Sequence, residues 1–439
     1  MSPPSFARRV AGVFATRVLQ FMSTIAVALL LARLLGPDGR GAYALLLLLP
    51  STLFAFAQLG LPSAVTYFAG RGRSLGSLLL VAAVATALLP AILVPLTLVV
   101  LPALQEGVFR AAPADLMRVA LIALPIQFGA SLFGSILWGR QMVRRYTIIL
   151  ASQSVASLVA VVALVGILHL DVVGALAANL LVTGSVTLVV LLTVWRAARA
   201  EAAQGVPRRP VRVLELISYG IRLYPASIST FLSYRSDLFL LGLLIGDAGA
   251  IGLYTLAVSL AELTFHVPDA IATILYPRVA AAERAEADQI APSMTRFTLL
   301  VTLIAAAALI PTAVIVVHVI VPAFSGSIVP FLVLVPGTVA LSVAKVVSGY
   351  VSGLGRPLPV GLISIAALVL NVSLNLILIP RLGITGASLS SLISYSTHAF
   401  LMVAVASRLS SAPIRAFLLP GRAEARRLTE RVRQLAGRG

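Results

Sequence analysis

Three basic side chains lie inside stretches of sequence that are otherwise apolar. Arg17, Arg222 and Lys345, the only lysine in the chain, each fall within a run long enough to span a membrane. A charged group inside a membrane is costly, and it usually faces a cavity or a partner. Diphosphate or uronic-acid groups would be attracted to such residues, because a low-dielectric cavity strengthens the attraction. We therefore expect an anion-binding cavity, with snorkelling of these side chains to the membrane interface as the alternative.

The run that carries Arg222 has the richest polar pattern. At 100° per residue of an α-helix, Arg222, Ser229, Ser233 and Asp237 fall within roughly 80° of one another. Arg235 points to the opposite side of the same helix. The stripe is typical of a cavity wall that binds substrate, and structural pairing of Asp237 with a neighbouring helix is the alternative.

A second polar set consists of Glu262, His266 and Asp269, spaced i, i+4 and i+7. They share one helical face, and a carboxylate beside an imidazole in low dielectric suits proton coupling. We interpret Glu262, His266 and Asp237 as candidates for proton or ion coupling. A hydrogen-bonded clamp that only fixes helix packing is the alternative.

Asn371 and Asn375 lie on one face of another predicted helix. Their amides suit sugar hydroxyls and complete the predicted substrate-binding set. Hydrogen bonding between helices is an equally good interpretation.

Other chemistry is excluded by what the sequence lacks. The chain has no cysteine, and its four histidines show no metal-ligand spacing. No phosphate-binding P-loop is present. We therefore expect no enzyme activity, no metal site and no cofactor.

The composition indicates a membrane protein. Of the 439 residues, 59% are hydrophobic and 11% are charged, whereas roughly a quarter of residues are charged in soluble domains. The net charge of +18 is carried mostly between apolar runs, which favours membrane topology over nucleic-acid binding.

Twelve runs are long and apolar enough to be predicted as spanning helices. They cover residues 11–35, 41–69, 77–102, 116–138, 147–168, 172–195, 215–245, 250–275, 297–318, 326–348, 358–379 and 384–407. If every run crosses and the N-terminus is cytoplasmic, most arginines fall on the cytoplasmic side and only a few on the opposite side. This bias predicts both the twelve spans and two cytoplasmic termini.

A repeat divides the chain into two similar parts. Gly41–Tyr43 recurs at Gly252–Tyr254, and Gly174 has a counterpart in Gly386. Six helices per repeat place both halves in the same orientation, which predicts two pseudo-symmetric six-helix bundles. We assign residues 1–200 to the first bundle, 201–214 to a cytoplasmic linker, 215–407 to the second bundle and 408–439 to a basic cytoplasmic tail.

Three stretches carry a resemblance to a known family. They read ARLLGPDGRGAYAL at 32–45, RSDLFLLGLLIGDAGAIGLYTLA at 235–257 and LNVSLNLILIPRLGITGASLSSLISY at 370–395. Together they resemble the polysaccharide flippases of the multidrug/oligosaccharidyl-lipid/polysaccharide exporter superfamily. The resemblance covers nearly the whole chain, and the third stretch is the most specific.

This resemblance implies two bundles around a central cavity with alternating access. It implies movement of polyprenyl-diphosphate-linked oligosaccharide to the outer leaflet of a bacterial cytoplasmic membrane. Its partners would be the lipid-linked glycan and membrane lipids, with a polysaccharide polymerase and glycosyltransferases as candidates, and no nucleic acid. Two alternatives stay open: a cation-coupled multidrug antiporter, for which Asp237 would be the coupling acid, and a non-transporting scaffold of a polysaccharide assembly complex.

Overall fold

The described part of the chain is helical throughout. The computed structural model describes residues 6–205, 208–265, 268–269, 271–272, 275, 279, 283–410 and 412–419. Within these ranges there is no strand, which confirms the predicted all-helical class. Two compact units are formed: unit 1 comprises Met1–Leu256 and His318–Gly326, and unit 2 comprises Ala257–Val317 and Ser327–Gly439.

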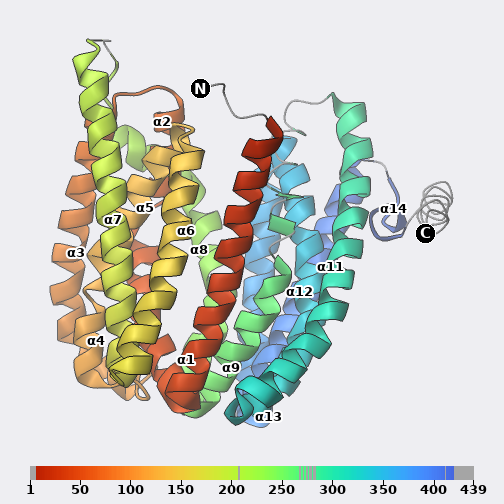
Figure 1. The fold of residues 1–439 in the computed structure, drawn as a ribbon. Coiled ribbons are helices and arrows are strands. Elements are labelled where there is room, and N and C mark those ends of the chain that lie inside the picture. The colour runs from red at the N-terminus through yellow and green to blue at the C-terminus, as the bar shows by residue number, and fades with distance from the viewer. Residues whose placement is uncertain are drawn as a thin grey trace. The chain divides into compact units, whose positions relative to one another are not determined.

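Unit 1 is built from long helices joined by short turns (Figure 1). Its helices are α1 (Phe6–Ala57), α2 (Leu61–Gly70), α3 (Leu75–Glu106), α4 (Ala114–Ala120), α5 (Ala123–Gly139), α6 (Val143–Val161), α7 (Asp171–Ala203), α8 (Val213–Leu244) and the first part of α9 (Ala248–Ala261). A π-turn, Val162–Ile167, extends α6.

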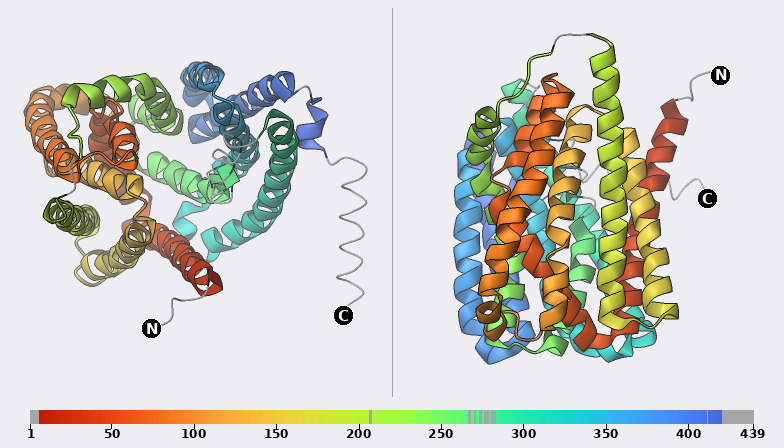
Figure 2. Two further views of the ribbon diagram at one scale, coloured as in Figure 1. Left: turned by 90° about the horizontal axis from the view of Figure 1, so that it is seen from above. Right: turned by 90° about the vertical axis from the view of Figure 1, so that its left-hand side faces the viewer.

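The core of unit 1 joins five of these helices. Helix α5 packs against α2, α3 and α7, while α1 packs against α6 and α7 (Figure 2). Val65, Leu78, Phe128, Val194 and Leu216, one from each of α2, α3, α5, α7 and α8, are almost fully buried. Helix α8 therefore belongs to the packed core of unit 1. The bundle limits predicted from the sequence remain a prediction.

Helix α1 contains the first of the two related turns. It bends at Gly36, whose φ of 66° lies in the left-handed region that glycine adopts without strain. The second arm ends at Ala57, and α2 begins at Leu61 after Gly60, with a φ of 71°. The single helix predicted over 41–69 is therefore wrong. A β-carbon at Gly60 would collide with the Gly220 carbonyl oxygen, so this break brings two backbones together.

The two stretches that the repeat relates are in direct contact. A β-carbon at Gly41 would collide with the carbonyl oxygen of Ala248, and one at Gly252 would collide with that of Pro37. The contact is reciprocal, because Pro37 corresponds to Ala248 in the repeat and Gly41 corresponds to Gly252. Only glycine permits so close an approach at both positions. The wider two-fold symmetry of the bundles remains a prediction.

Unit 2 is built around two helices that pack along their length. Its described helices are most of α11 (Arg284–Ile320), α12 (Ile328–Gly353), α13 (Pro357–Ser410) and α14 (Arg415–Leu418), together with the 3₁₀ turn η2 (Glu262–Phe265). The 3₁₀ turn η3 (Pro322–Ser327) belongs to unit 1 up to Gly326. Helix α13 bends at Gly383, with a φ of 58°, so its two arms form a hairpin. A β-carbon at Gly337 would lie 2.8 Å from the Leu392 Cα, which shows how closely α12 and α13 approach.

Nine helical segments of the described residues are long and apolar enough to cross a membrane. Two of these nine, Leu19–Ala57 and Pro357–Ser410, contain the bends at Gly36 and Gly383. Helix α8 is not among the nine, and it carries four charged residues, Glu215, Arg222, Arg235 and Asp237. The structure thus supports a multi-pass membrane protein, while the count of twelve spans remains a prediction.

The outer face of α3 shows how such a helix meets lipid. Leu80, Val84, Leu88, Ile92 and Leu96 recur every four residues and are all exposed. Residues with this spacing form one stripe on a helix. An apolar stripe of this length is unfavourable in water but matches the hydrocarbon core of a bilayer.

Candidate functional site

The basic residues predicted to bind an anion are in different surroundings. Arg17 lies in α1, and its side chain is outside the part that the structure describes. Arg222, in the third turn of α8, is exposed and forms no salt bridge with the described residues. Lys345 lies in α12 of unit 2 and is paired with an acid. Of the two whose side chains are described, Arg222 is exposed, whereas the Lys345 side chain is only 20% exposed.

The serines on the same helix are turned inward. Ser229 is 5% exposed, and its hydroxyl donates to the Pro225 carbonyl oxygen at 2.7 Å. The Ser233 hydroxyl donates to the Ser229 carbonyl oxygen at 2.8 Å. Both bonds run back along α8, the usual way for a hydroxyl to be satisfied inside a membrane helix. In this conformation the two hydroxyls therefore form hydrogen bonds to their own helix rather than facing an open surface.

Asp237 is held by a residue that the sequence analysis did not assign. The Tyr254 hydroxyl donates to Asp237 Oδ2 at 2.6 Å, and both side chains are buried, at 2% and 4% exposed. The two residues lie at similar distances on either side of Gly246, the turn between α8 and α9. Residues that lie equally far before and after the turn of a helical hairpin face each other. This spacing would have predicted the pair of Asp237 and Tyr254.

The second acidic set lies in unit 2. Glu262 begins the 3₁₀ turn η2 and is half-buried, whereas His266 lies outside the described residues. Asp269 forms a salt bridge with Lys345, with 2.8 Å between Asp269 Oδ1 and Lys345 Nζ. The Lys345 ammonium also lies 3.9 Å from the centroid of the Phe265 ring. The partner of Lys345 therefore comes from the segment that the sequence analysis assigned to proton coupling.

Asn371 and Asn375 hold the two arms of α13 together. Asn371 Nδ2 donates to the hydroxyls of Ser391 at 3.3 Å and Ser394 at 3.2 Å, and Asn375 Nδ2 donates to Asn371 Oδ1 at 2.9 Å. The two asparagines are 1% and 0% exposed. This arrangement favours the alternative interpretation, hydrogen bonding between helices. Their role in binding sugars is not supported by it.

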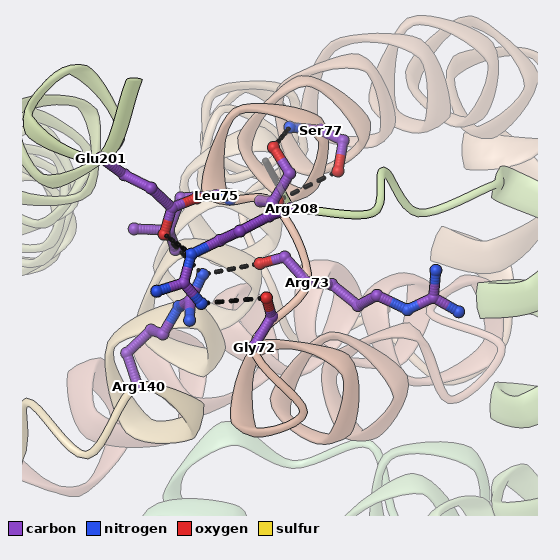
Figure 3. Close-up of polar contacts among 8 residues, drawn as sticks. Gly72, Arg73, Leu75, Ser77, Arg140, Glu201 and Arg208 are labelled. Carbon is purple, nitrogen blue, oxygen red and sulfur yellow. Dashed lines mark hydrogen bonds and ion pairs between the residues drawn. The ribbon is translucent and has the colours of Figure 1, made fainter. Parts of the chain in front are cut away.

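A further charged cluster, at one end of unit 1, was not assigned a role from the sequence (Figure 3). Glu201 Oε2 lies 2.8 Å from Arg140 Nη2 and 3.2 Å from Arg208 Nε, and Glu201 Oε1 accepts from the Leu75 backbone at 2.8 Å. Arg140 and Glu201 are each 14% exposed. Glu201 is the only acidic residue between Asp171 and Glu215, and several arginines lie near it in the sequence. This isolated acid among arginines could have predicted the cluster.

The same cluster ties the segment before α8 to the loop between α2 and α3. Arg208 Nη1 donates to the Gly72 carbonyl oxygen at 3.0 Å, and Arg73 pairs with Glu215 at 3.2 Å. Burial lowers the pKa of Arg140; Glu201 opposes this shift, and nearby Arg208 adds to it. The arrangement is structural: it fixes the chain that leads into α8 and so fixes the position of Arg222 within unit 1.

No cluster of three or more His, Asp or Glu residues suited to a metal ion occurs among the described residues. The geometry instead offers an exposed cation on α8, a buried carboxylate bonded to a tyrosine, and a lysine paired with an exposed carboxylate. Such groups can attract an anion and respond to its charge.

Comparison with protein families gives a match over the first part of the chain. The model of a family described as polysaccharide biosynthesis protein matches residues 9–283, more than half of the chain. No curated protein matches.

Comparison with solved structures gives matches over almost the whole chain. An inward closed conformation of lipid II flippase MurJ has a TM-score of 0.70 at 14% identity, covering 92% of this chain and 89% of that one. A P26A mutant of a MATE protein has a TM-score of 0.63 at 21% identity, covering 90% and 93%. An inward-facing MATE multidrug resistance transporter of the MOP superfamily has a TM-score of 0.62 at 20% identity, covering 91% and 94%. These likenesses establish a shared fold.

Proposed function

The chain belongs to the polysaccharide biosynthesis protein family, within the multidrug/oligosaccharidyl-lipid/polysaccharide exporter superfamily, and we propose that it is a flippase for lipid-linked oligosaccharide. In this proposal it moves a polyprenyl-diphosphate-linked oligosaccharide from the inner to the outer leaflet of a bacterial cytoplasmic membrane by alternating access. Both termini would be cytoplasmic, as the arginine distribution predicts.

The observation that carries this proposal is the family match over residues 9–283. The fold it shares with a lipid II flippase supports the same class of substrate, a saccharide attached to a lipid. The exposed guanidinium of Arg222 on α8 supports an anionic group in that substrate, because a charged side chain within a membrane protein usually faces a cavity or a partner.

We assign the diphosphate to the basic residues. As the sequence predicts, Arg17, Arg222 and Lys345 are the candidates to bind its oxygens, for which arginine is suited by its planar fork of donors. The lipid chain would stay in the bilayer while the glycan passes through the protein. In this conformation Ser229 and Ser233 bond within α8, and Asn371 and Asn375 hold the two arms of α13 together.

A proton or cation gradient would return the empty protein. Asp237 is the best candidate to couple to it, because its carboxylate is buried and accepts a hydrogen bond from the Tyr254 phenol, which would respond to its protonation. Glu262 and His266 are the further candidates from the sequence.

A second candidate function is cation-coupled drug export, favoured by the fold shared with the MATE multidrug transporters. The two functions differ in cargo. A flippase carries an anionic lipid and needs accessible cations, whereas an exporter of cationic drugs needs accessible acids. Arg222 is exposed and Asp237 is buried, which favours the flippase.

The test is deletion of the gene, followed by measurement of lipid-linked glycans in each leaflet. We expect glycan-lipid to accumulate facing the cytoplasm, with restoration by the wild-type gene. Unchanged glycan-lipids together with increased sensitivity to cationic drugs would instead establish the drug exporter. If glycan-lipid accumulates in the deletion strain and a variant that cannot transport also removes this accumulation, the protein acts as a scaffold.

A further inference from the structure

Lys345 is held by two groups from one neighbouring segment of unit 2. Its ammonium lies 2.8 Å from Asp269 Oδ1 and 3.9 Å from the centroid of the Phe265 ring. The two acceptors are four residues apart, on either side of the point where the chain leaves η2. The lysine therefore meets an aromatic face and a carboxylate together, both of which attract a cation.

The surroundings of Lys345 explain why it requires an anion. Lys345 is the only charged residue of α12, and its neighbours Ala344 and Val346 are buried. An ammonium in such a helix is unfavourable unless an opposite charge compensates it. Asp269 supplies that charge in the conformation described.

The pair is asymmetric in exposure. The Lys345 side chain is 20% exposed, whereas the Asp269 side chain is 57% exposed. The carboxylate is thus the more accessible member of the pair. An ion pair with one partner open to solvent is weak, so another anion of higher charge can take the place of the carboxylate.

We propose that Asp269 is a resident anion that substrate diphosphate must displace from Lys345, and that it excludes lipids carrying a single negative charge. The proposal rests on the flippase function and adds a selectivity device to it. A bilayer contains many monoanionic phospholipids, and an unoccupied lysine would bind their phosphodiesters. A diphosphate carries more charge and more acceptor oxygens, so it competes with the carboxylate where a phosphodiester does not.

The single lysine of the chain makes a direct test possible. Reductive methylation with ¹³C-formaldehyde keeps the charge and labels only Lys345 and the terminal amine of the full chain. Lys345→Gln assigns the side-chain signal. The protein is placed in phosphatidylcholine nanodiscs and titrated with geranylgeranyl diphosphate, with phosphatidylglycerol, and with geranylgeraniol as an uncharged control.

We expect geranylgeranyl diphosphate to shift the Lys345 signal of the wild type, while phosphatidylglycerol and geranylgeraniol leave it in place. In Asp269→Asn, diphosphate should bind several-fold more tightly, and phosphatidylglycerol should now shift the signal. Asp269→Glu, which keeps the charge, should retain the discrimination. This variant separates loss of charge from misfolding.

Two results would overturn the inference. If radiolabelled geranylgeranyl diphosphate binds but the Lys345 signal does not move, or if Asp269→Asn still ignores phosphatidylglycerol, Asp269 is no resident anion and the proposed function stands. If the wild type binds diphosphate no better than the alcohol, the proposed function fails together with the inference.

Discussion

At the scale of single residues, the polar side chains inside the helices are of two kinds, neutral groups and charged groups. Neutral groups such as Ser229 and Asn371 find partners within their own hairpin or helix. One or two neighbours can satisfy the hydrogen-bonding groups of a hydroxyl or an amide. A guanidinium has five donors, which one or two neighbours rarely satisfy. Arg222 is exposed and forms no salt bridge with the described residues, and it is the arginine of α8 that we assign to the ligand.

The bond between Tyr254 and Asp237 gives a prediction at this scale. Tyr254→Phe removes one donor from a buried carboxylate, and we expect a loss of about 1 kcal/mol of stability, as for hydrogen bonds between membrane helices. Thermal unfolding of Tyr254→Phe, Asp237→Asn and the double variant measures the coupling. Strictly additive effects of the two substitutions would show that the bond does not contribute.

At the scale of elements, close backbone contacts and one charged cluster determine how the helices of unit 1 meet. Gly41 and Gly252 allow the two related turns to touch, and Gly60 and Gly220 do the same for α8 and the turn between α1 and α2. The Glu201 cluster holds the segment that leads into α8. None of these contacts involves a large apolar side chain.

Gly41→Ala tests the first of these contacts. The added methyl group meets the Ala248 carbonyl oxygen, and we expect a loss of about 1–3 kcal/mol, typical of overpacking. Gly361→Ala in α13 is the matched control, because nothing lies near its added β-carbon and alanine favours a helix. Equal folded yield and equal melting temperature of the two variants would contradict the contact.

Glu201→Gln tests the cluster. Arg140 and Arg208 would lose their shared carboxylate, and since Arg140 is mostly buried we expect destabilisation of about 2–3 kcal/mol. The segment before α8 should also be released, which limited trypsin cleavage at the Arg208–Arg209 bond would detect. Glu215→Gln, at a more exposed pair, should have a smaller effect. Equal cleavage rates in wild type and Glu201→Gln would show that the cluster does not hold this segment.

At the scale of the whole chain, the sequence predicts the helical class, the membrane setting and two breaks between apolar runs, at 36–40 and 380–383, where the structure has the bends at Gly36 and Gly383. Apolar run length and glycine placement determine these features locally. The break before α2 and the Asp269 partner of Lys345 were not predicted, because each depends on a segment distant in sequence. The asparagines of α13 were ambiguous for the same reason: their face is periodic, but only packing decides what it meets.

Transport by the purified protein tests the central claim most directly. The protein is reconstituted into liposomes that contain a polyprenyl-diphosphate-linked saccharide, and its appearance in the opposite leaflet is measured with a lectin or glycosidase that cannot cross the membrane. We predict protein-dependent translocation that falls at least tenfold in Arg222→Ala. It should persist in Arg222→Lys and in Arg235→Ala, an exposed arginine of the same helix. Absence of translocation by the folded wild type, or full activity of Arg222→Ala, would contradict the account.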